Sequence, residues 1–449
     1  MAITDSPPLV SLQAPKDISI DEIEGELQEI WRHYSGEDGP AASRATTFSF
    51  IVYEPEPTQP LLAALGFYTG PVDGIAGPRT TAAIKAAQKA YGVEPTGKSN
   101  QELLAKLQSE FNAQSKNGGD VKQFSPDLEG SGVADAIAAS NPCRIITLCP
   151  TVGPDEGVSA QVSAYCPIQK ANKSSLVCCE YITLRGTAAA LERIGGMISA
   201  LTISGLPQFV WWKASPEPEY GLFKRLVSES NSIIIDSSKF TAPEADLLRI
   251  GELIEKELPI ADLNWGRLAA WQELAAEAFD PPERRSALTE IDRVTIDYEK
   301  GNQTQALMYL GWLASRLQWH PVSYEHEGGD YDIRRVKFTT AEQRTIEAEL
   351  AGVPTADTGD VQGDLISLRL SSTNLDADCC TVLCSETTGC MRMEAGGGAQ
   401  SCRIQQVTSL FDQDTEKLLG RQLQRGGREL LYHESMKVTT GILRLATAE

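Results

Sequence analysis

Five of the ten cysteines lie near the C-terminal end of the chain, and their spacing limits the chemistry open to them. In "DADCCTVLCSETTGCMRM", Cys379, Cys380, Cys384 and Cys390 follow one another closely, and Cys402 comes shortly after. The pattern lacks the paired Cys-x2-Cys knuckles of structural zinc sites, and no histidine lies nearby. The spacing therefore disfavours zinc or an iron–sulfur cluster, and it leaves three alternatives: a disulfide framework, a redox switch or buried thiols.

A hairpin would bring two of these cysteines together. The segments "TVLC" and "CMRM" flank "SETTG", where Gly389 accepts a positive φ without strain. Cys384 and Cys390 are then expected opposite each other, with Cβ atoms about 4.5–5.5 Å apart, close to what a disulfide needs. Closing so short a loop adds only about 2–2.5 kcal/mol of stability, which suits a reversible bond. We predict a redox pair at Cys384 and Cys390; reduced, half-buried thiols on a two-faced strand stay the open alternative.

The other cysteines considered lie in apolar segments. Cys143 and Cys149 bound "CRIITLC", and Cys178 and Cys179 stand in "SLVCCEYITL". Both segments are predicted to be strands, so these cysteines are expected in the core.

A tryptophan pair is the main candidate for partner binding. Trp211 and Trp212 end the apolar segment "GLPQFVWWKA" and precede a proline-rich loop. Neighbouring side chains of a strand point to opposite faces, so both cannot enter one core layer. Tryptophan is enriched at interface hot spots, which makes the pair a candidate partner-binding site. Burial of both rings under flanking helices stays the alternative.

The sequence offers no catalytic, cofactor or metal site. The four histidines are His33, His320, His326 and His433, and none forms a metal-type pair. There is no Gly-x-Ser-x-Gly elbow and no phosphate-binding loop. We therefore predict a protein that is not an enzyme, although sites assembled from distant residues leave no motif.

Charge and hydropathy exclude several classes of partner. The formal net charge is −21 and the pI is about 4.7, which argues against nucleic acid and against an anionic membrane surface. The first residues have no signal-peptide pattern, and no segment is long and apolar enough to span a bilayer. We expect a cytoplasmic protein, where thiols are reduced by default and a disulfide is more often regulatory than structural.

Periodicity predicts a mixed α/β fold. The expected parts are 1–56, a helix and first strand; 57–110, a three-helix insert; 111–133, a polar linker; 134–260, the rest of a mostly parallel α/β domain; and 261–449, an α+β domain.

The insert resembles the small peptidoglycan-binding-like domain. The hallmarks in this sequence are Leu65-Gly66-Phe67-Tyr68, Gly70, Val72-Asp73-Gly74, Gly77-Pro78, Thr80, Gln88 and Gly92. The likeness covers residues 61–108 and is specific for fold. It is less specific for ligand, because a module in the cytosol meets no peptidoglycan, so a structural or docking role is the preferred interpretation.

Outside the insert the chain resembles the glucose-6-phosphate dehydrogenase assembly protein family, OpcA. The likeness is carried in order by "NPCRIITL" (141–148), "GLPQFVWW" (205–212), "ADLNWGRLAAWQ" (261–272), "GWLASRL" (311–317) and "ELLYHESM" (429–436). The resemblance implies a non-catalytic protein that binds the dehydrogenase, promotes its active oligomer and raises its activity.

The insert and the cysteine-rich segment depart from the simpler family pattern. Both look like features of members from oxygenic photosynthetic bacteria, which implies control by thioredoxin. Two alternatives remain: a cell-wall-binding protein that uses the insert, and a sugar-phosphate enzyme in its own right.

Overall fold

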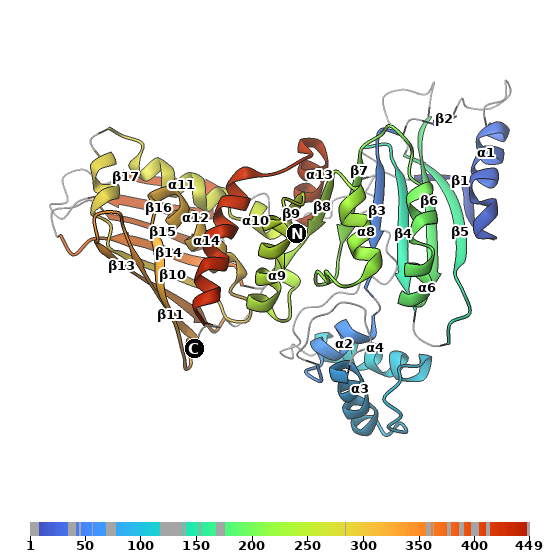
Figure 1. Ribbon diagram of the computed structural model, residues 1–449, viewed down its shortest axis with the longest axis horizontal. Helices are drawn as coiled ribbons and strands as arrows, with labels where there is room; N and C mark the ends of the chain where they lie inside the picture. The colour runs from blue at the N-terminus through green and yellow to red at the C-terminus, as the bar shows by residue number, and fades with distance from the viewer. Residues whose placement is uncertain are drawn as a thin grey trace. The chain divides into compact units, whose positions relative to one another are not determined.

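Two compact units make up the chain (Figure 1). The computed structural model describes residues 9–34, 42–44, 46–55, 57–68, 78–116, 137, 141–151, 154–167, 176–282, 284–355, 361, 363–374, 379–385, 390–396, 404–409 and 414–446. Unit 1 comprises Met1–Ile235 and Leu419–Gly427, and unit 2 comprises Asp236–Leu418 and Arg428–Glu449. The boundary after Ile235 therefore lies before the one expected from the sequence at residue 260.

Unit 1 is built on a mostly parallel sheet. Its strands are β1 (Leu9–Ile18), β2 (Ala42–Arg44), β3 (Ser49–Tyr53), β4 (Arg144–Pro150), β5 (Ser159–Pro167), β6 (Leu176–Gly186), β7 (Gln208–Trp212) and β8 (Ser232–Ile235). They lie in the order β1-β5-β6-β4-β3-β7-β8, with β2 beside β6. The pairs β1–β5 and β5–β6 are antiparallel, and the others are parallel.

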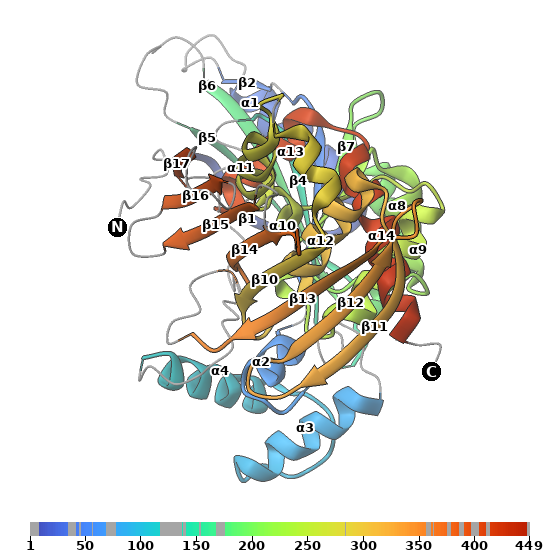
Figure 2. The ribbon, with the colours of Figure 1, turned by 90° about the vertical axis from the view of Figure 1, so that its left-hand side faces the viewer.

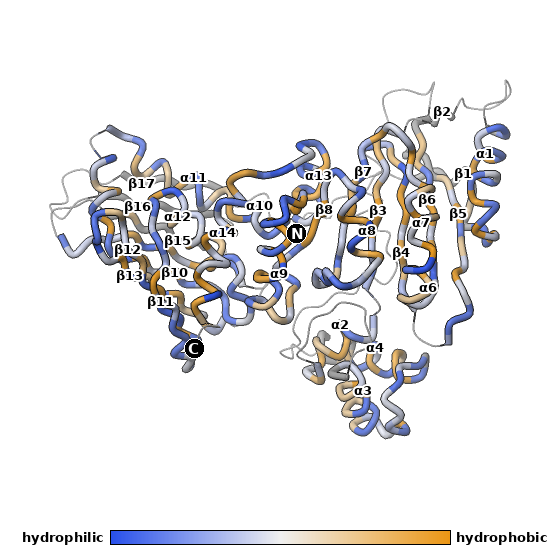
Figure 3. Tube along the Cα trace, viewed as in Figure 1, coloured by the Kyte–Doolittle hydropathy of each residue, from blue (hydrophilic) through white to orange (hydrophobic). Residues whose placement is uncertain are grey.

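Strands β3, β7 and β8 of unit 1 are mostly apolar, as expected for a sheet that is covered on both faces. Every residue of β3, β7 and β8 is buried, and Figure 3 shows largely hydrophobic colour there. The helices of this unit are α1 (Ile23–Tyr34), α6 (Ala188–Arg193), α7 (Gly195–Ala200) and α8 (Gly221–Glu229).

The insert has a core of its own. Its helices are α2 (Thr58–Ala64), α3 (Pro78–Ala90) and α4 (Gln101–Lys116), so α4 runs past the expected boundary at residue 110. Buried residues of all three helices, among them Leu61, Ala87 and Leu107, form one hydrophobic cluster. Most of the expected linker lies outside the described residues.

Unit 2 contains a second, mainly antiparallel sheet. Its strands are β10 (Arg293–Glu299), β11 (His320–Gly328), β12 (Ile333–Thr339), β13 (Thr345–Val353), β14 (Leu365–Ser371), β15 (Cys379–Ser385), β16 (Cys390–Gly396) and β17 (Ile404–Ser409). The order is β11-β12-β13-β10-β14-β15-β16-β17, and only β10–β13 is parallel among these described pairs.

Helices cover one face of this sheet. Figure 2 shows α11 (Ala269–Phe279), α12 (Thr304–Leu317) and α14 (Leu430–Ala446) on that face. The unit also holds α9 (Pro243–Glu255), β9 (Ile260–Asp262) and α10 (Leu263–Gly266), and α13 (Thr415–Arg425) runs from unit 2 into unit 1. The predicted fold class is thus confirmed: a mixed α/β chain with a mostly parallel N-terminal sheet, a three-helix insert and a C-terminal α+β part.

Candidate functional site

The expected cysteine hairpin is present, but its register differs from the prediction. β15 and β16 pair antiparallel, with Cys384 opposite Met391 and Ser385 opposite Cys390. The expectation that Cys384 and Cys390 face each other directly is therefore wrong, because β15 continues through Ser385, the first residue of the expected loop. A shift of one residue moves a position to the other face of the sheet.

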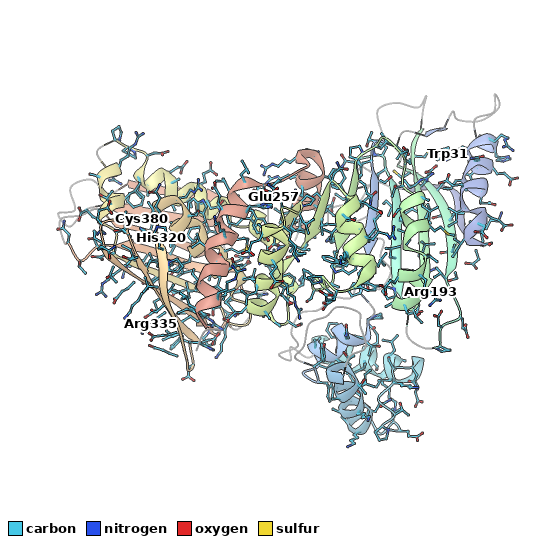
Figure 4. The ribbon with its side chains drawn as sticks, viewed as in Figure 1. Trp31, Arg193, Glu257, His320, Arg335 and Cys380 are labelled. Atoms are coloured by element: carbon cyan, nitrogen blue, oxygen red, sulfur yellow. The ribbon has the colours of Figure 1, made fainter. Side chains whose placement is uncertain are left out.

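The redox assignment of that pair stays a prediction. The side chains of Cys384 and Cys390 lie outside the described part of the structure. Cys380, labelled in Figure 4, is fully buried and is not disulfide-bonded.

Both candidate tryptophans are buried in unit 1. Trp211 is 5% exposed and Trp212 is 0% exposed, so the structure shows the alternative in which flanking elements cover both rings. They take opposite faces of β7, as expected: Trp211 lies parallel to Phe50, and Trp212 stacks on Tyr53 at 3.8 Å. In this conformation neither ring offers a surface to a partner, and the partner-binding assignment stays a prediction.

Cys143, Cys178 and Cys179 are buried as expected, whereas Cys149 is only half-buried, and the four are not all thiols. Cys143 and Cys179 lie side by side, and the hydrogen bond between them, with burial, raises the pKa of the Cys143 thiol. Burial raises the pKa of Cys149 to about 11. Cys178 is disulfide-bonded, which the apolar pattern of its strand did not indicate.

A buried polar cluster in unit 2 was missed by the sequence analysis. The Arg267 guanidinium donates to both carboxylate oxygens of Asp236, at 2.8 and 2.9 Å. Burial would raise the pKa of Asp236, but attraction to Arg267 and its hydrogen bonds outweigh burial and lower the pKa to about 2. Asp236 is therefore an anion at neutral pH, paired with the Arg267 cation.

Asp262 stands beside this pair and behaves in the opposite way. Its Oδ1 accepts hydrogen bonds from the backbone N–H groups of Ser237 and Asn264, at 3.0 and 2.9 Å. Its Oδ2 has no hydrogen-bond partner within the described residues. Burial and repulsion by Asp236 raise the pKa of Asp262 to about 6. Two neighbouring carboxyl groups thus have pKa values far apart, an arrangement that can bind or release a proton near neutrality.

The same region joins two of the sequence motifs. Trp265, from the 261–272 motif, donates its indole N–H to Glu429 at 2.9 Å, and its ring packs on Tyr432 at 5.6 Å. Both partners belong to the 429–436 motif. Burial and the nearby Asp262 carboxylate raise the pKa of Tyr432. The signal available in the sequence was the presence of Asp, Asn and Arg inside an otherwise apolar motif.

The third motif of unit 2 supplies a close helix contact. Gly311 of α12 lies where a Cβ atom would come 2.2 Å from Thr439 Oγ1 and 2.7 Å from the Ser435 carbonyl oxygen of α14. Ser435 donates its hydroxyl to the Met308 carbonyl at 2.7 Å. The three C-terminal motifs therefore build one helix-packed region.

Unit 1 brings its own two motifs together in the same way. β4, from the 141–148 motif, and β7, from the 205–212 motif, both pair with β3. Arg144 of β4 is 2% exposed, and its Nε donates to Glu180 Oε2 at 2.7 Å. Trp31 of α1 (Figure 4) donates its indole N–H to Oε1 of the same carboxylate at 2.5 Å.

One cavity in unit 1 lies beside the 205–212 motif. Its volume is about 420 Å³. It is lined by Thr47, Phe48, Pro207, Phe209, Asn231, Leu423, Gln424, Gly426 and Gly427. Aromatic walls with a few amide groups are typical of a place that receives a side chain or a small molecule.

Neither a metal centre nor a membrane span is found in the described parts. Among the described residues no group of three or more His, Cys, Asp or Glu side chains could hold a metal ion. No helix in the ranges that the structure covers is long and apolar enough to cross a bilayer.

The fold and the motif-built regions define a multidomain mixed α/β protein with a helical insert. The chain belongs to the OpcA family of glucose-6-phosphate dehydrogenase assembly proteins. Residues 134–252 match the "Glucose-6-phosphate dehydrogenase subunit N-terminal domain" and residues 258–436 match the corresponding C-terminal domain. Residues 58–107 match the "Putative peptidoglycan binding domain", which confirms the predicted likeness of the insert.

Curated relatives resemble the chain over its whole length. The chain is 64% identical to the "Putative OxPP cycle protein OpcA" of Synechocystis sp., over 100% of this chain and 96% of that protein. Proteins of the same name from Nostoc punctiforme and Synechococcus elongatus are 62% and 54% identical, over 98% and 99% of this chain and 96% and 100% of theirs. The family descriptions and these names relate the chain to glucose-6-phosphate dehydrogenase and to the OxPP cycle.

Solved structures add no functional argument. A 3-ketoreductase from Actinomadura kijaniata matches with a TM-score of 0.36 and 10% identity, over 54% of this chain and 77% of that one. That likeness is too low to support a conclusion.

Proposed function

We propose that this protein is a non-catalytic assembly factor and allosteric activator of glucose-6-phosphate dehydrogenase in the oxidative pentose phosphate pathway, acting on the oligomeric enzyme in the cytoplasm. The observation that carries the proposal is the pair of family matches, at 134–252 and 258–436, both described as dehydrogenase-subunit domains.

The placement of the motif residues supports a binding role. Trp212 and Arg144 are buried in the sheet of unit 1, and Trp265 is tied to Glu429 in unit 2. These motifs build buried, hydrogen-bonded cores, and a surface that such a core holds in one conformation binds with little loss of conformational entropy.

An activator acts by binding one conformation of the enzyme better than another. A difference in affinity of about 1–3 kcal/mol changes the equilibrium roughly five- to 150-fold. Because linkage is reciprocal, the substrate should tighten binding of the activator by the same factor.

The activator is proposed to respond to thiol redox state through Cys384 and Cys390, with thioredoxin as the reductant. The observed register leaves the two cysteines one step out of alignment. Formation of their disulfide would therefore require the end of the hairpin to slip by one residue, which exchanges the two faces of that segment. Such a slip provides a structural difference for the dehydrogenase to sense.

Co-purification and kinetics test the proposal. The dehydrogenase should be retained by the immobilised protein, and its activity should rise in proportion to occupancy, whereas the isolated protein should turn over no sugar phosphate. The factor by which this protein raises the affinity of the dehydrogenase for its substrate should equal the factor by which the substrate raises the affinity for this protein. If the immobilised protein does not retain the dehydrogenase, the proposed partner is wrong. If the isolated protein turns over a sugar phosphate, the proposed non-catalytic role is wrong.

The redox part has a separate test. Oxidised wild-type protein should activate less than reduced protein, and a Cys384→Ser, Cys390→Ser variant should not respond. Cys149→Ser, which removes a thiol of unit 1, serves as the matched control. If oxidised and reduced wild-type protein activate the dehydrogenase equally, the redox switch is rejected, while the proposed partner is not affected.

A second candidate function follows from the insert. The match of residues 58–107 to a peptidoglycan-binding domain favours wall binding. Sedimentation with purified murein distinguishes the two functions, because an activator should stay in the supernatant.

A further inference from the structure

The disulfide of Cys178 is not used by the proposed function, and it lies in unit 1, away in sequence from the hairpin cysteines of unit 2. Cys178 is fully buried in β6 and is disulfide-bonded. The sequence pattern predicted only a core cysteine at this position.

The backbone register points to the partner. β5 and β6 pair antiparallel from Ser159 opposite Arg185 to Tyr165 opposite Cys179. Continued by one step beyond the last observed pair, the same register would place Cys166 of β5 opposite Cys178 of β6. Directly opposed positions have Cβ atoms about 4.5–5.5 Å apart, and a disulfide needs about 3.5–4.5 Å, so a small adjustment suffices.

The other cysteines fit less well. Cys143 and Cys149 are free thiols. Cys179 is adjacent to Cys178 in the strand, so its side chain takes the other face, where it contacts Cys143. Of the remaining five cysteines, between residues 379 and 402, Cys380 is not disulfide-bonded, and the described pairings of β6, with β2, β4 and β5, bring none of the five opposite Cys178.

We propose that Cys166 and Cys178 form a second dithiol–disulfide couple, one that fastens β5 to β6. A small dithiol reductant would break the S–S bond, deliver two electrons and two protons to the two cysteine sulfurs, and become a disulfide itself. The buried thiol of Cys143 and the half-buried thiol of Cys149 do not exchange with the bond, because their raised pKa values keep them protonated.

The proposed bond would join β5 to β6, and the edge strand β1 is held to the sheet through β5. β5 is the strand that pairs with β1. Two residues beyond Cys178, on the same face of β6, the Glu180 carboxylate accepts the hydrogen bonds of Trp31 and Arg144. Reduction should therefore loosen the β1–β5 edge, while β3, β7 and β8, which do not pair with β5, stay protected.

Peptide mapping of the full-length protein tests the connection. In protein alkylated without reductant, we expect one linked peptide pair that contains Cys166 and Cys178 and that disappears with dithiothreitol. Cys166→Ser and Cys178→Ser should each expose one additional alkylatable thiol, and Cys149→Ala should leave the linked pair unchanged. Complete alkylation of Cys178 in the oxidised protein, or its linkage to a cysteine of unit 2, would overturn the proposal.

Hydrogen exchange and thermal melting test the consequence on wild-type protein, without relying on variants that could misfold. Reduction should raise amide exchange in β1 and β5 more than in β7 and β8, and should lower the melting temperature of unit 1 by roughly 5–10 °C. The same protection and melting temperature in both redox states would reject the fastening role. None of these readouts involves the dehydrogenase, so failure here leaves the proposed function untouched.

Discussion

Asp236 and Asp262 are two buried carboxyl groups with opposite behaviour. Asp236 is paired with Arg267, and its pKa falls to about 2. Asp262 has no cation of its own, and burial with repulsion by Asp236 raises its pKa to about 6. The difference arises because one arginine neutralises one carboxylate, and the second must either bind a proton or remain an incompletely compensated buried anion.

The pair should give the protein an unusual pH dependence. Between about pH 4 and pH 6 the folded state holds a proton on Asp262 that the unfolded state has lost, so the stability due to this group is full below pH 4 and is lost as pH rises through 6. Asp236 acts oppositely, and its contribution is lost as pH falls from about 4 towards 2. About two pKa units for Asp262 correspond to about 3 kcal/mol.

We predict that Asp262→Asn gains stability relative to wild type by about 2–3 kcal/mol as pH rises from 4 to 7.5, because the amide cannot ionise. Urea denaturation at several pH values measures this difference. Asp155→Asn is the control: the pKa of Asp155 is lowered by its hydrogen bond with Arg193, so no change is expected in this window. Parallel curves for Asp262→Asn and wild type would contradict the assignment.

At the scale of elements, the contact of α12 with α14 depends on Gly311. Gly311→Ala places a Cβ atom 2.2 Å from Thr439 Oγ1 and 2.7 Å from a backbone oxygen, so the helices must separate. We predict a loss of about 1–3 kcal/mol in the free energy of unfolding.

A matched substitution in α1 gives the control. A Cβ atom at Gly25 meets nothing within 4 Å, so Gly25→Ala should be neutral or stabilising by up to about 1 kcal/mol. Denaturant titration of both variants checks the pair, and equal effects would show that the helix contact is looser than described.

The register of the β15–β16 hairpin leads to a cross-linking prediction. Because Ser385 stands opposite Cys390, a Ser385→Cys, Cys384→Ser variant should form its disulfide at a lower oxidant concentration than the Cys384–Cys390 pair of wild type. Peptide mapping in graded glutathione buffers measures this. Easier oxidation of the wild-type pair would support the register expected from the sequence over the observed one.

At the scale of the whole molecule, the insert should fold by itself. Its helices share one hydrophobic cluster, and the Gln88 amide, which is fully buried, bonds Thr96, the Lys98 carbonyl and the Gly97 N–H at 2.9–3.0 Å. We predict that a fragment of residues 57–116 melts cooperatively, with the marginal stability typical of a domain of this size. Circular dichroism checks it.

A Gln88→Leu variant of that fragment leaves the Gly97 N–H without its acceptor. We expect it to lower the free energy of unfolding by about 1–3 kcal/mol relative to the unmodified fragment. Ser109→Leu, at an exposed position of α4, is the control and should melt near wild type. A non-cooperative melt of the unmodified fragment would show that the insert needs the rest of unit 1.

The sequence by itself determined the elements and the classes of structure they form. Runs such as "SFIVY" and "QFVWW" are apolar after their first residues, Ser49 and Gln208, as expected for strands buried on both faces of a parallel sheet. The glycine-rich insert and the ordered motifs were enough to indicate the family, because local periodicity and turn residues are properties of short segments.

Only the tertiary structure decided how distant residues meet. Trp211 and Trp212 are buried among side chains from other elements, which no local pattern specifies. Phe50 packs beside Trp211, and Tyr53 of β3 and Phe223 of α8 pack on Trp212. The hairpin register depends on whether Ser385 extends β15, a choice of one residue that reverses faces. The Asp236–Arg267–Asp262 cluster and the disulfide of Cys178 join segments that are separate in sequence, and burial and opposing charge, set by the fold, give those residues their chemistry.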